Sequence, residues 1–422
     1  MSPCYVAAAM PPRDLLPRGL LPRDSQSRSL FAALVLHIGA MGGAVGAIGA
    51  LIPEMIRSFD WPYTHAGLVV AAGSASFVLS TTAAGFVLPR LGVRVTVAAG
   101  LLLEVLGLLL FGAWPGVALT AAVYALLGVG FGAMEVAGNE LVISMERGGR
   151  GQLMNLVHAA FAVGGITVTW ATSWFLESGG DWRLVYRLLA GATLLVALFL
   201  LTRPALAVTG MARGAGGAAQ QGRRRRSVPD RSQALLLVIL AAMGVYVGIE
   251  LGVAAWMSEF IVTAVGGSVA EGARIVSLYW VGLCLGRVGV GILHRGTGHA
   301  RVILTLAAVA VVGLTITVPA GGLGWAAAGA VITGIGLSAL YPLLISLAGS
   351  EYPTRRSQAM GLTAASGGLG SMLVPLAITV VADAFGIRAG MLVYLGLAVI
   401  LSGLSVALLS MTRTLRTARD HV

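Results

Sequence analysis

The sequence predicts an all-α integral membrane protein with about twelve transmembrane helices, grouped into two pseudo-symmetric six-helix bundles. Three observations lead to this prediction. The 422-residue chain is 57% hydrophobic and only 11% charged, apolar runs of about 20 residues recur along it, and several motifs return at one fixed offset. Because a backbone in lipid must satisfy its own hydrogen bonds, we interpret each apolar run as a helix.

The composition excludes an ordinary soluble protein of this length, because so few charged residues cannot form a polar surface. The mean hydropathy is +0.89 and the net charge is +11. In a soluble protein that charge would suggest nucleic-acid binding, but the arginines of a membrane protein collect in its cytoplasmic segments. We therefore expect a lipid bilayer around the chain and no nucleic acid as a partner.

Each apolar run gives one predicted span: 30–52, 64–88, 95–113, 117–144, 152–176, 183–202, 233–257, 271–293, 302–319, 324–348, 357–381 and 389–411. Placing the N-terminus inside puts most arginines in cytoplasmic segments. This orientation predicts a multi-pass protein of the cell inner (plasma) membrane with both termini cytoplasmic. The predicted parts are a disordered cytoplasmic tail (1–29), an N-terminal bundle (30–202), a cytoplasmic linker (203–232), a C-terminal bundle (233–411) and a cytoplasmic tail (412–422).

The two halves repeat at an offset of 206 residues. Gly128-Val129-Gly130 returns as Gly334-Ile335-Gly336 (334 − 128 = 206), and Gly164 returns as Gly370 (370 − 164 = 206). The run Arg150-Gly151-Gln152-Leu153-Met154 likewise returns as Arg356-Ser357-Gln358-Ala359-Met360. Independent matches at one offset indicate a duplicated six-helix unit.

A glycine- and arginine-rich loop joins the second and third predicted spans. It reads Gly85-Phe86-Val87-Leu88-Pro89-Arg90-Leu91-Gly92-Val93-Arg94. This loop and the parallel duplication together make the chain resemble the major facilitator superfamily over nearly its whole length. The resemblance implies that Gly85, Arg90, Gly92 and Arg94 belong to a conformational latch. Because Pro89 stands where the family usually has Asp, we expect this latch to be altered and do not assign it the family's charge-relay role.

A finer resemblance, to the fucose-permease-like branch of sugar:proton symporters, rests on five segments of the chain. They are Gly132-Ala133-Met134-Glu135-Val136-Ala137-Gly138-Asn139, Leu153-Met154-Asn155-Leu156-Val157-His158, Tyr246-Val247-Gly248-Ile249-Glu250, Leu278-Tyr279-Trp280-Val281-Gly282-Leu283 and Ser338-Ala339-Leu340-Tyr341-Pro342. This resemblance implies proton-coupled sugar uptake, with Glu135 as the proton-coupling acid. Where an acid is expected in the first helix of that branch, this chain offers His37.

Ionisable residues inside membrane spans are costly unless they face a partner or a wet cavity, so they indicate function. Glu135 lies near mid-helix, with Asn139 one turn away on the same face. Asn155 and His158 share a face of the next span, and Tyr341 occupies the repeat position of Glu135 (341 − 135 = 206). We expect these residues, with Trp256 and His37, to contribute to a substrate site; interhelical hydrogen bonding is the alternative for the polar ones.

Glu250 and Arg287 lie in consecutive spans of the C-terminal half. An ion pair that shapes this half is the plainer interpretation, and charge recognition of a substrate by Glu250 or Arg287 is the alternative. Glu104 and Glu140 are expected to be structural.

The sequence has no phosphate-binding loop and no Cys/His cluster, which argues against a pump, an enzyme, a metal site or a cofactor. We therefore expect a monomeric secondary transporter that binds a small-molecule substrate and couples to protons or sodium. Proton-coupled sugar symport is the first hypothesis. A proton-coupled drug or metabolite exporter, which predicts a broad apolar cavity, is the alternative; a membrane receptor or scaffold is the third.

Overall fold

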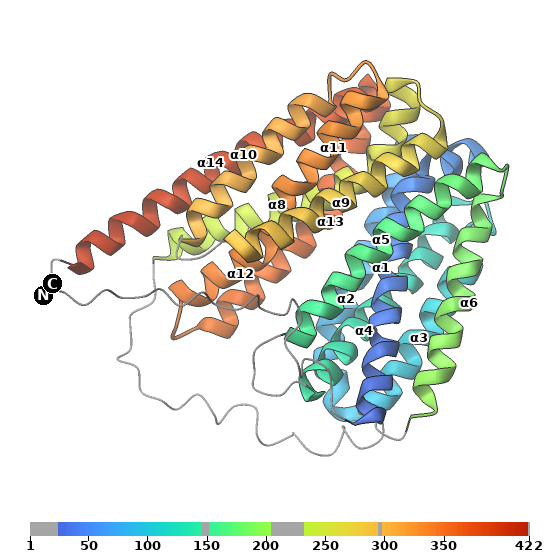
Figure 1. The fold of residues 1–422 in the computed structure, drawn as a ribbon, viewed down its shortest axis with the longest axis horizontal. Helices are drawn as coiled ribbons and strands as arrows, with labels where there is room; N and C mark the ends of the chain where they lie inside the picture. Colours follow the sequence, from blue (N-terminus) through green and yellow to red (C-terminus); the bar gives the residue numbers. More distant parts are fainter. Residues whose placement is uncertain (1–23, 146–151, 204–231, 294–297, 421–422) are drawn as a thin grey trace, which may run out of the picture.

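The computed structural model describes residues 24–145, 152–203, 232–293 and 298–420. Within this part of the chain, 12 helices are long and apolar enough to cross a membrane. The described residues form helices and connecting turns, without strands. The predicted fold class, an all-α membrane protein of two six-helix bundles, is therefore confirmed (Figure 1).

The N-terminal half contains six helices: α1 (Ser25–Phe59), α2 (Tyr63–Leu91), α3 (Val93–Leu110), α4 (Val117–Met145), α5 (Gln152–Glu177) and α6 (Trp182–Leu201). The C-terminal half contains α8 (Gln233–Phe260) with the short π-helix η1 (Ile261–Val265), α9 (Val269–Leu293), α10 (His299–Thr317), α11 (Leu323–Leu337), α12 (Leu340–Glu351), α13 (Arg356–Phe385) and α14 (Ile387–Asp420). The helices α11 and α12 form one span, Leu323–Glu351, that is interrupted at Ser338 and Ala339.

Two terminal segments differ from their predicted bounds. The helix α1 begins at Ser25, inside the predicted tail 1–29, because the Asp24 side chain caps it and accepts a hydrogen bond from the Ser27 backbone N–H at 2.7 Å. The helix α14 continues through Asp420, past the predicted end at 411. The prediction followed the apolar run alone, and the helix goes on through the polar residues after it. Residues 1–23 and 204–231 of the predicted tail and linker lie outside the described residues.

Glycines allow the helices of each half to approach closely. A Cβ on Gly164 of α5 would collide with the Gly39 carbonyl of α1, and one on Gly370 of α13 would collide with the Gly244 carbonyl of α8. Gly164 and Gly370 are the repeat-related pair, so the same close crossing recurs in both halves. In membranes such small-residue contacts supply the packing that holds helices together.

The two bundles meet at one end and splay apart at the other (Figure 1). At the end where they meet, here called the closed end, α5 and η1 finish and α2 and α9 begin. At the opposite end, here called the linker end, α1 and α8 begin and α6 finishes. Hydrogen bonds from Ser258 to the Ala50 carbonyl (3.2 Å) and from Ser277 to the Ile166 carbonyl (3.0 Å) join the halves.

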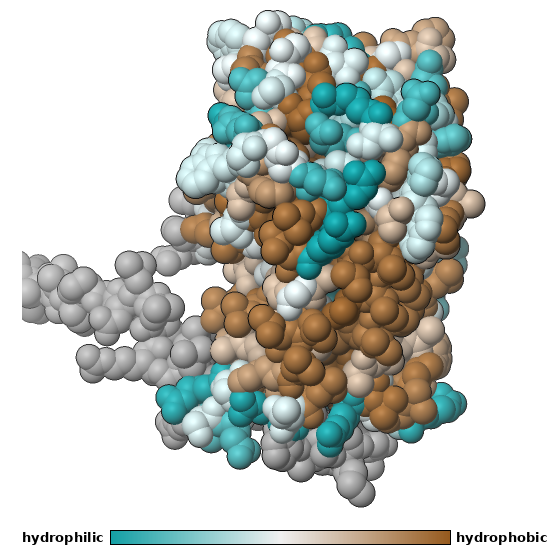
Figure 2. Space-filling view, turned by 90° about the vertical axis from the view of Figure 1, so that its right-hand side faces the viewer, coloured by the Kyte–Doolittle hydropathy of each residue, from teal (hydrophilic) through white to brown (hydrophobic). Residues whose placement is uncertain are grey.

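The outer surface is largely apolar, as lipid contact requires. Leu79, Leu195 and Phe385 expose 70%, 70% and 79% of their surface. On the face drawn in Figure 2, apolar side chains dominate the middle and lower part, and hydrophilic side chains gather toward the two ends. This distribution fits a multi-pass membrane protein.

Candidate functional site

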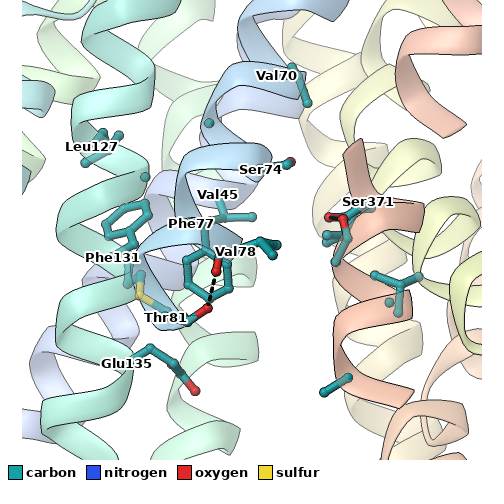
Figure 3. Close-up of a pocket in the computed structure, with 18 of the residues that line it drawn as sticks. Val45, Val70, Ser74, Phe77, Val78, Thr81, Leu127, Phe131, Glu135 and Ser371 are labelled. Carbon is teal, nitrogen blue, oxygen red and sulfur yellow. Dashed lines mark hydrogen bonds between the residues drawn. The ribbon is translucent and has the colours of Figure 1, made fainter. Parts of the chain in front are cut away.

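A cavity of about 530 Å³ lies between the two halves. Its walls come from α1, α2, α4 and α5 on one side and from α8, α12 and α13 on the other. Figure 3 shows α2 and α4 facing Ser371 of α13 across this space. The lining residues Thr82 and Gly361 lie in the parts of α2 and α13 that are nearer the linker end, and Tyr341 lies in the second half of the span Leu323–Glu351, which also ends there. The cavity therefore extends toward the linker end.

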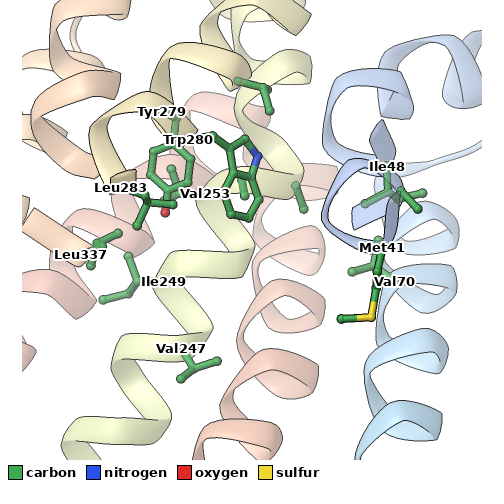
Figure 4. Close-up of a cluster of buried hydrophobic side chains, with 14 of the residues drawn as sticks. Met41, Ile48, Val70, Val247, Ile249, Val253, Tyr279, Trp280, Leu283 and Leu337 are labelled. Atoms are coloured by element: carbon green, nitrogen blue, oxygen red, sulfur yellow. The ribbon is translucent and has the colours of Figure 1, made fainter. Parts of the chain in front are cut away.

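Most of the cavity wall is apolar. Phe77, Phe131 and Val78 line it from the N-terminal half, and Figure 4 shows Met41 of α1 and Val247 of α8 on its two sides. Three of its hydroxyl groups donate to carbonyls of their own helices: Thr81 to Val78 O (2.9 Å), Thr82 to Val78 O (2.8 Å) and Ser371 to Gly368 O (2.7 Å). The hydrogen of each of these hydroxyl groups is therefore already bonded to the backbone and is not free to bind a ligand.

Glu135 is the single charged residue among the described residues that line the cavity. Its carboxylate Oε1 accepts a hydrogen bond from Asn139 Nδ2 at 3.0 Å, one helical turn along α4. A Cβ on the neighbouring Gly132 would approach the Phe77 carbonyl of α2 to 2.7 Å, so glycine lets α4 lie close against α2. This packing aims the carboxyl group of Glu135 into the cavity (Figure 3).

Tyr341 faces the same cavity from the other half. It lies in the first turn of α12, directly after the interruption at Ser338 and Ala339, and exposes 41% of its surface. Its hydroxyl lies close enough to the carboxyl groups of Glu135 and Glu250 for a Coulombic interaction with each. Tyr341 therefore interacts electrostatically with one acid of each half, Glu135 and Glu250.

Glu250 and Arg287 form the predicted ion pair, with Arg287 Nη2 at 3.4 Å from Glu250 Oε1. The Tyr246 hydroxyl donates to the other Glu250 oxygen, and the Tyr279 hydroxyl donates to the Glu250 carbonyl at 2.9 Å. Arg287 Nε also donates to the Ser338 carbonyl at 2.9 Å, at the interruption between α11 and α12. This cluster fixes the bend that carries Tyr341, and it lies behind the cavity wall.

Three further predicted residues do not line the cavity. His37 is buried against Glu104 of α3, with Nε2 at 3.6 Å from Glu104 Oε1, and Trp256 is buried with its ring centroid 5.8 Å from that of Tyr63. His158 lies on an exposed part of α5. Asn155 falls within the bounds of α5, but its side chain lies outside the described residues.

The segment predicted to be a glycine–arginine loop, residues 85–94, lies at the linker end and is helical except at Gly92, because α2 continues to Leu91 and α3 begins at Val93. Gly92 adopts a φ of +79°, which an L side chain rarely adopts, whereas Gly85 has no neighbour within 4 Å of an added Cβ. Arg90 donates to the Phe86 carbonyl of its own helix at 2.6 Å, and Arg94 to the Leu201 carbonyl of α6 at 3.4 Å. Both arginines thus bind within the N-terminal half.

The sequence does not indicate the part of the cavity wall that Phe77 of α2, Phe131 of α4 and Ser371 of α13 supply. Phe77, Phe131 and Ser371 carry no signal in the sequence that separates them from lipid-facing or packing residues. The repeat, which pairs α2 with α9 and α5 with α13, was the only signal that could have directed attention to these helices.

Comparison with known families decides which family this is. A family model described as Major Facilitator Superfamily matches residues 32–355. The chain belongs to the Major Facilitator Superfamily. Members of this superfamily are membrane transporters, so the protein is a transporter that takes a small-molecule substrate.

Solved structures of several transporters share the fold. The chain is similar to a nucleoside transporter, NupG (TM-score 0.71, 15% identity, covering 92% of this chain and 99% of that one). It is also similar to a D-xylose-proton symporter (0.70, 14%, 89% and 96%) and to FucP in the outward conformation (0.57, 21%, 90% and 99%). Comparison with curated protein sequences gives no match.

Proposed function

We propose that this protein is a proton-coupled secondary transporter of small organic cations with an apolar body, and that it exports them from the cytoplasm. The cation occupies the central cavity with its charge at Glu135, and a proton replaces it there when the cavity faces the other side. The observation that carries this proposal is the composition of the cavity wall, in which one carboxyl group stands among apolar side chains.

The apolar wall favours a substrate with few hydroxyl groups. A polyol requires a polar partner for most of its hydroxyls, because a buried hydroxyl without one costs roughly 1–3 kcal/mol. Thr81, Thr82 and Ser371 already donate to their own backbones. An aromatic or aliphatic body, in contrast, packs against Phe77, Phe131 and Val78 without leaving polar groups unpaired.

The direction of transport follows from the predicted orientation. The arginine-rich segments favour a cytoplasmic location for the linker end, and the cavity extends toward that end. A positive solute entering from the cytoplasm would meet Glu135, and both the solute and a proton neutralise the same carboxylate. Their mutual exclusion couples export of the cation to entry of the proton.

Sugar:proton symport is the second candidate. It is favoured by the hydrogen bond between Asn139 and Glu135, because an amide beside a carboxylate offers a sugar hydroxyl both a donor and an acceptor. The structural likeness to the D-xylose-proton symporter and to FucP adds support at the level of the fold.

Proton flux in liposomes distinguishes the two candidates. The purified protein is reconstituted around a luminal pH dye, with empty liposomes as the control. With an acidic lumen, external benzyltrimethylammonium should raise the luminal pH as protons leave in exchange for the cation. With an acidic bath, D-xylose or L-fucose should leave the luminal pH unchanged.

Two variants make this experiment specific. Glu135→Gln should abolish the cation-evoked response, and Glu140→Gln, on the same helix but outside the cavity lining, should retain it. A luminal acidification evoked by sugar, together with no response to the cation, would replace the exporter proposal with symport. No response to either solute would overturn both candidates.

A further inference from the structure

Two acids at repeat-related positions lie where the halves meet. Glu177 is the last residue of α5 and Asp383 lies near the end of α13, and they are separated by the repeat offset (383 − 177 = 206). Each reaches the beginning of a helix in the opposite half. Those helices, α2 and α9, begin at Tyr63 and Val269, again 206 apart (269 − 63 = 206).

Asp383 supplies the cap that α2 lacks. The residue before α2 is Pro62, whose side chain makes no capping hydrogen bond. The Asp383 carboxylate instead accepts from the backbone N–H groups of Tyr63 (2.7 Å) and Thr64 (3.0 Å). A carboxylate at a helix N-terminus satisfies free N–H groups and interacts favourably with the helix dipole.

Glu177 contacts the repeat-related helix from the other half, through a side chain and not through the backbone N–H groups. It forms an ion pair with Arg274, in the second turn of α9. Nearby, the Tyr63 hydroxyl donates to Glu259 of α8 at 3.1 Å, so a third acid joins the halves at this end. The closed end is thus held by polar contacts that both repeats contribute.

At the linker end, the described residues around the junction of α2 and α3 make their hydrogen bonds within one half. Pro89 lies in the last turn of α2, and the neighbouring Arg90 and Arg94 donate to carbonyls of their own half. We propose that Asp383 and Glu177 are positioning residues which lock the closed end, and that they bias the protein toward the conformer whose cavity opens at the linker end. Rocking of the bundles removes the α2 cap and the Glu177–Arg274 pair together.

Distances between spin labels on the two halves test this proposal without any substrate. In a Cys4→Ser/Cys284→Ser background, one pair of labels at Ala113→Cys and Gly321→Cys reports the closed end. A second pair at Thr202→Cys and Ser350→Cys reports the linker end. The double variant Asp383→Ala/Glu177→Ala should raise the population with a long closed-end distance and a short linker-end distance by about three- to tenfold.

A matched control is Asp181→Ala. Asp181 is an acid at the same end that accepts from the Arg183 N–H at 3.0 Å within its own half, and its removal should leave both distance distributions unchanged. Charge reversal in Glu177→Arg/Arg274→Glu should restore the closed population that Glu177→Ala loses.

The outcomes are decisive in both directions. Unchanged distances in the Asp383→Ala/Glu177→Ala variant would overturn the proposal, as would an equal shift in Asp181→Ala. If the double variant does not fold, the charge-reversal pair decides: failure to restore closure relative to Glu177→Ala contradicts the lock. Because no substrate or proton gradient is used, these results are independent of the transport proposal.

Discussion

Glu135 of α4 and Tyr341 of α12 occupy equivalent positions of the repeat, 206 residues apart, and line one cavity from opposite halves. The tyrosine hydroxyl lies within Coulombic reach of Glu135 and of Glu250 behind the wall. Any rocking of the halves therefore changes the surroundings of the acid at the centre of the cavity. The relationship links the charge of Glu135 to the conformation of the transporter.

Tyr341→Phe should slow coupled transport without emptying the site. The ring remains as part of the cavity wall, but the hydroxyl that interacts electrostatically with Glu135 is lost, and a polar interaction of this kind contributes about 0.5–1.5 kcal/mol. We expect the cation-evoked proton flux in liposomes to fall by up to about tenfold. Tyr124→Phe, which removes another hydroxyl from the same wall but packs against Phe111 in the N-terminal half, should change the flux less than about twofold; equal effects would contradict the assignment.

Gly164→Ala should destabilise the N-terminal half, because its Cβ would collide with the Gly39 carbonyl where α5 crosses α1. Overpacking of this kind costs roughly 1–3 kcal/mol. Thermal unfolding in detergent should show a lower midpoint for Gly164→Ala and for its repeat equivalent Gly370→Ala. Gly191→Ala is the control, since nothing lies within 4 Å of a Cβ there; a midpoint lowered equally in that variant would refute the close-crossing explanation.

Arg287→Met should destabilise the C-terminal half more than Glu250→Gln/Arg287→Met. The single variant leaves the Glu250 carboxylate, whose side chain is only 10% exposed, without its cation, whereas the double variant removes the charge as well. Breaking a fully buried pair costs about 3–5 kcal/mol, and roughly half of that is expected here because Arg287 is partly exposed. A double-mutant cycle of unfolding free energies measures the difference, and additive effects would show that the pair is not coupled.

The sequence was sufficient for the helices and for the repeat, because both depend on hydropathy and on spacing along the chain. It also identified Glu135 and Tyr341, since an acid inside a span is costly and the repeat places Tyr341 opposite. It could not show how each helix is rotated. The burial of His37 against Glu104, rather than at the cavity, depends on how α1 packs on α3, which hydropathy does not encode.

Aromatic residues show the same limit. Trp256, Phe77 and Phe131 are equally apolar in the sequence, yet the first is buried against Tyr63 and the other two line the cavity. The contacts of Asp383 with the start of α2 span 320 and 319 residues along the chain. Such contacts require the two halves to be placed relative to each other, and no local pattern predicts them.

The central claim is that an organic cation and a proton compete for Glu135. If so, binding of the cation favours the ionised carboxylate and releases a proton, and the affinity for the cation falls as the pH is lowered. Titration calorimetry of the detergent-solubilised protein with benzyltrimethylammonium, in two buffers of different ionisation enthalpy, counts the protons released. We predict that the wild-type chain and Glu140→Gln release protons on binding the cation, that the number released rises toward one per cation as the assay pH is lowered, and that Glu135→Gln releases none. Binding without proton release at every assay pH, or the same release from Glu135→Gln, would contradict the account.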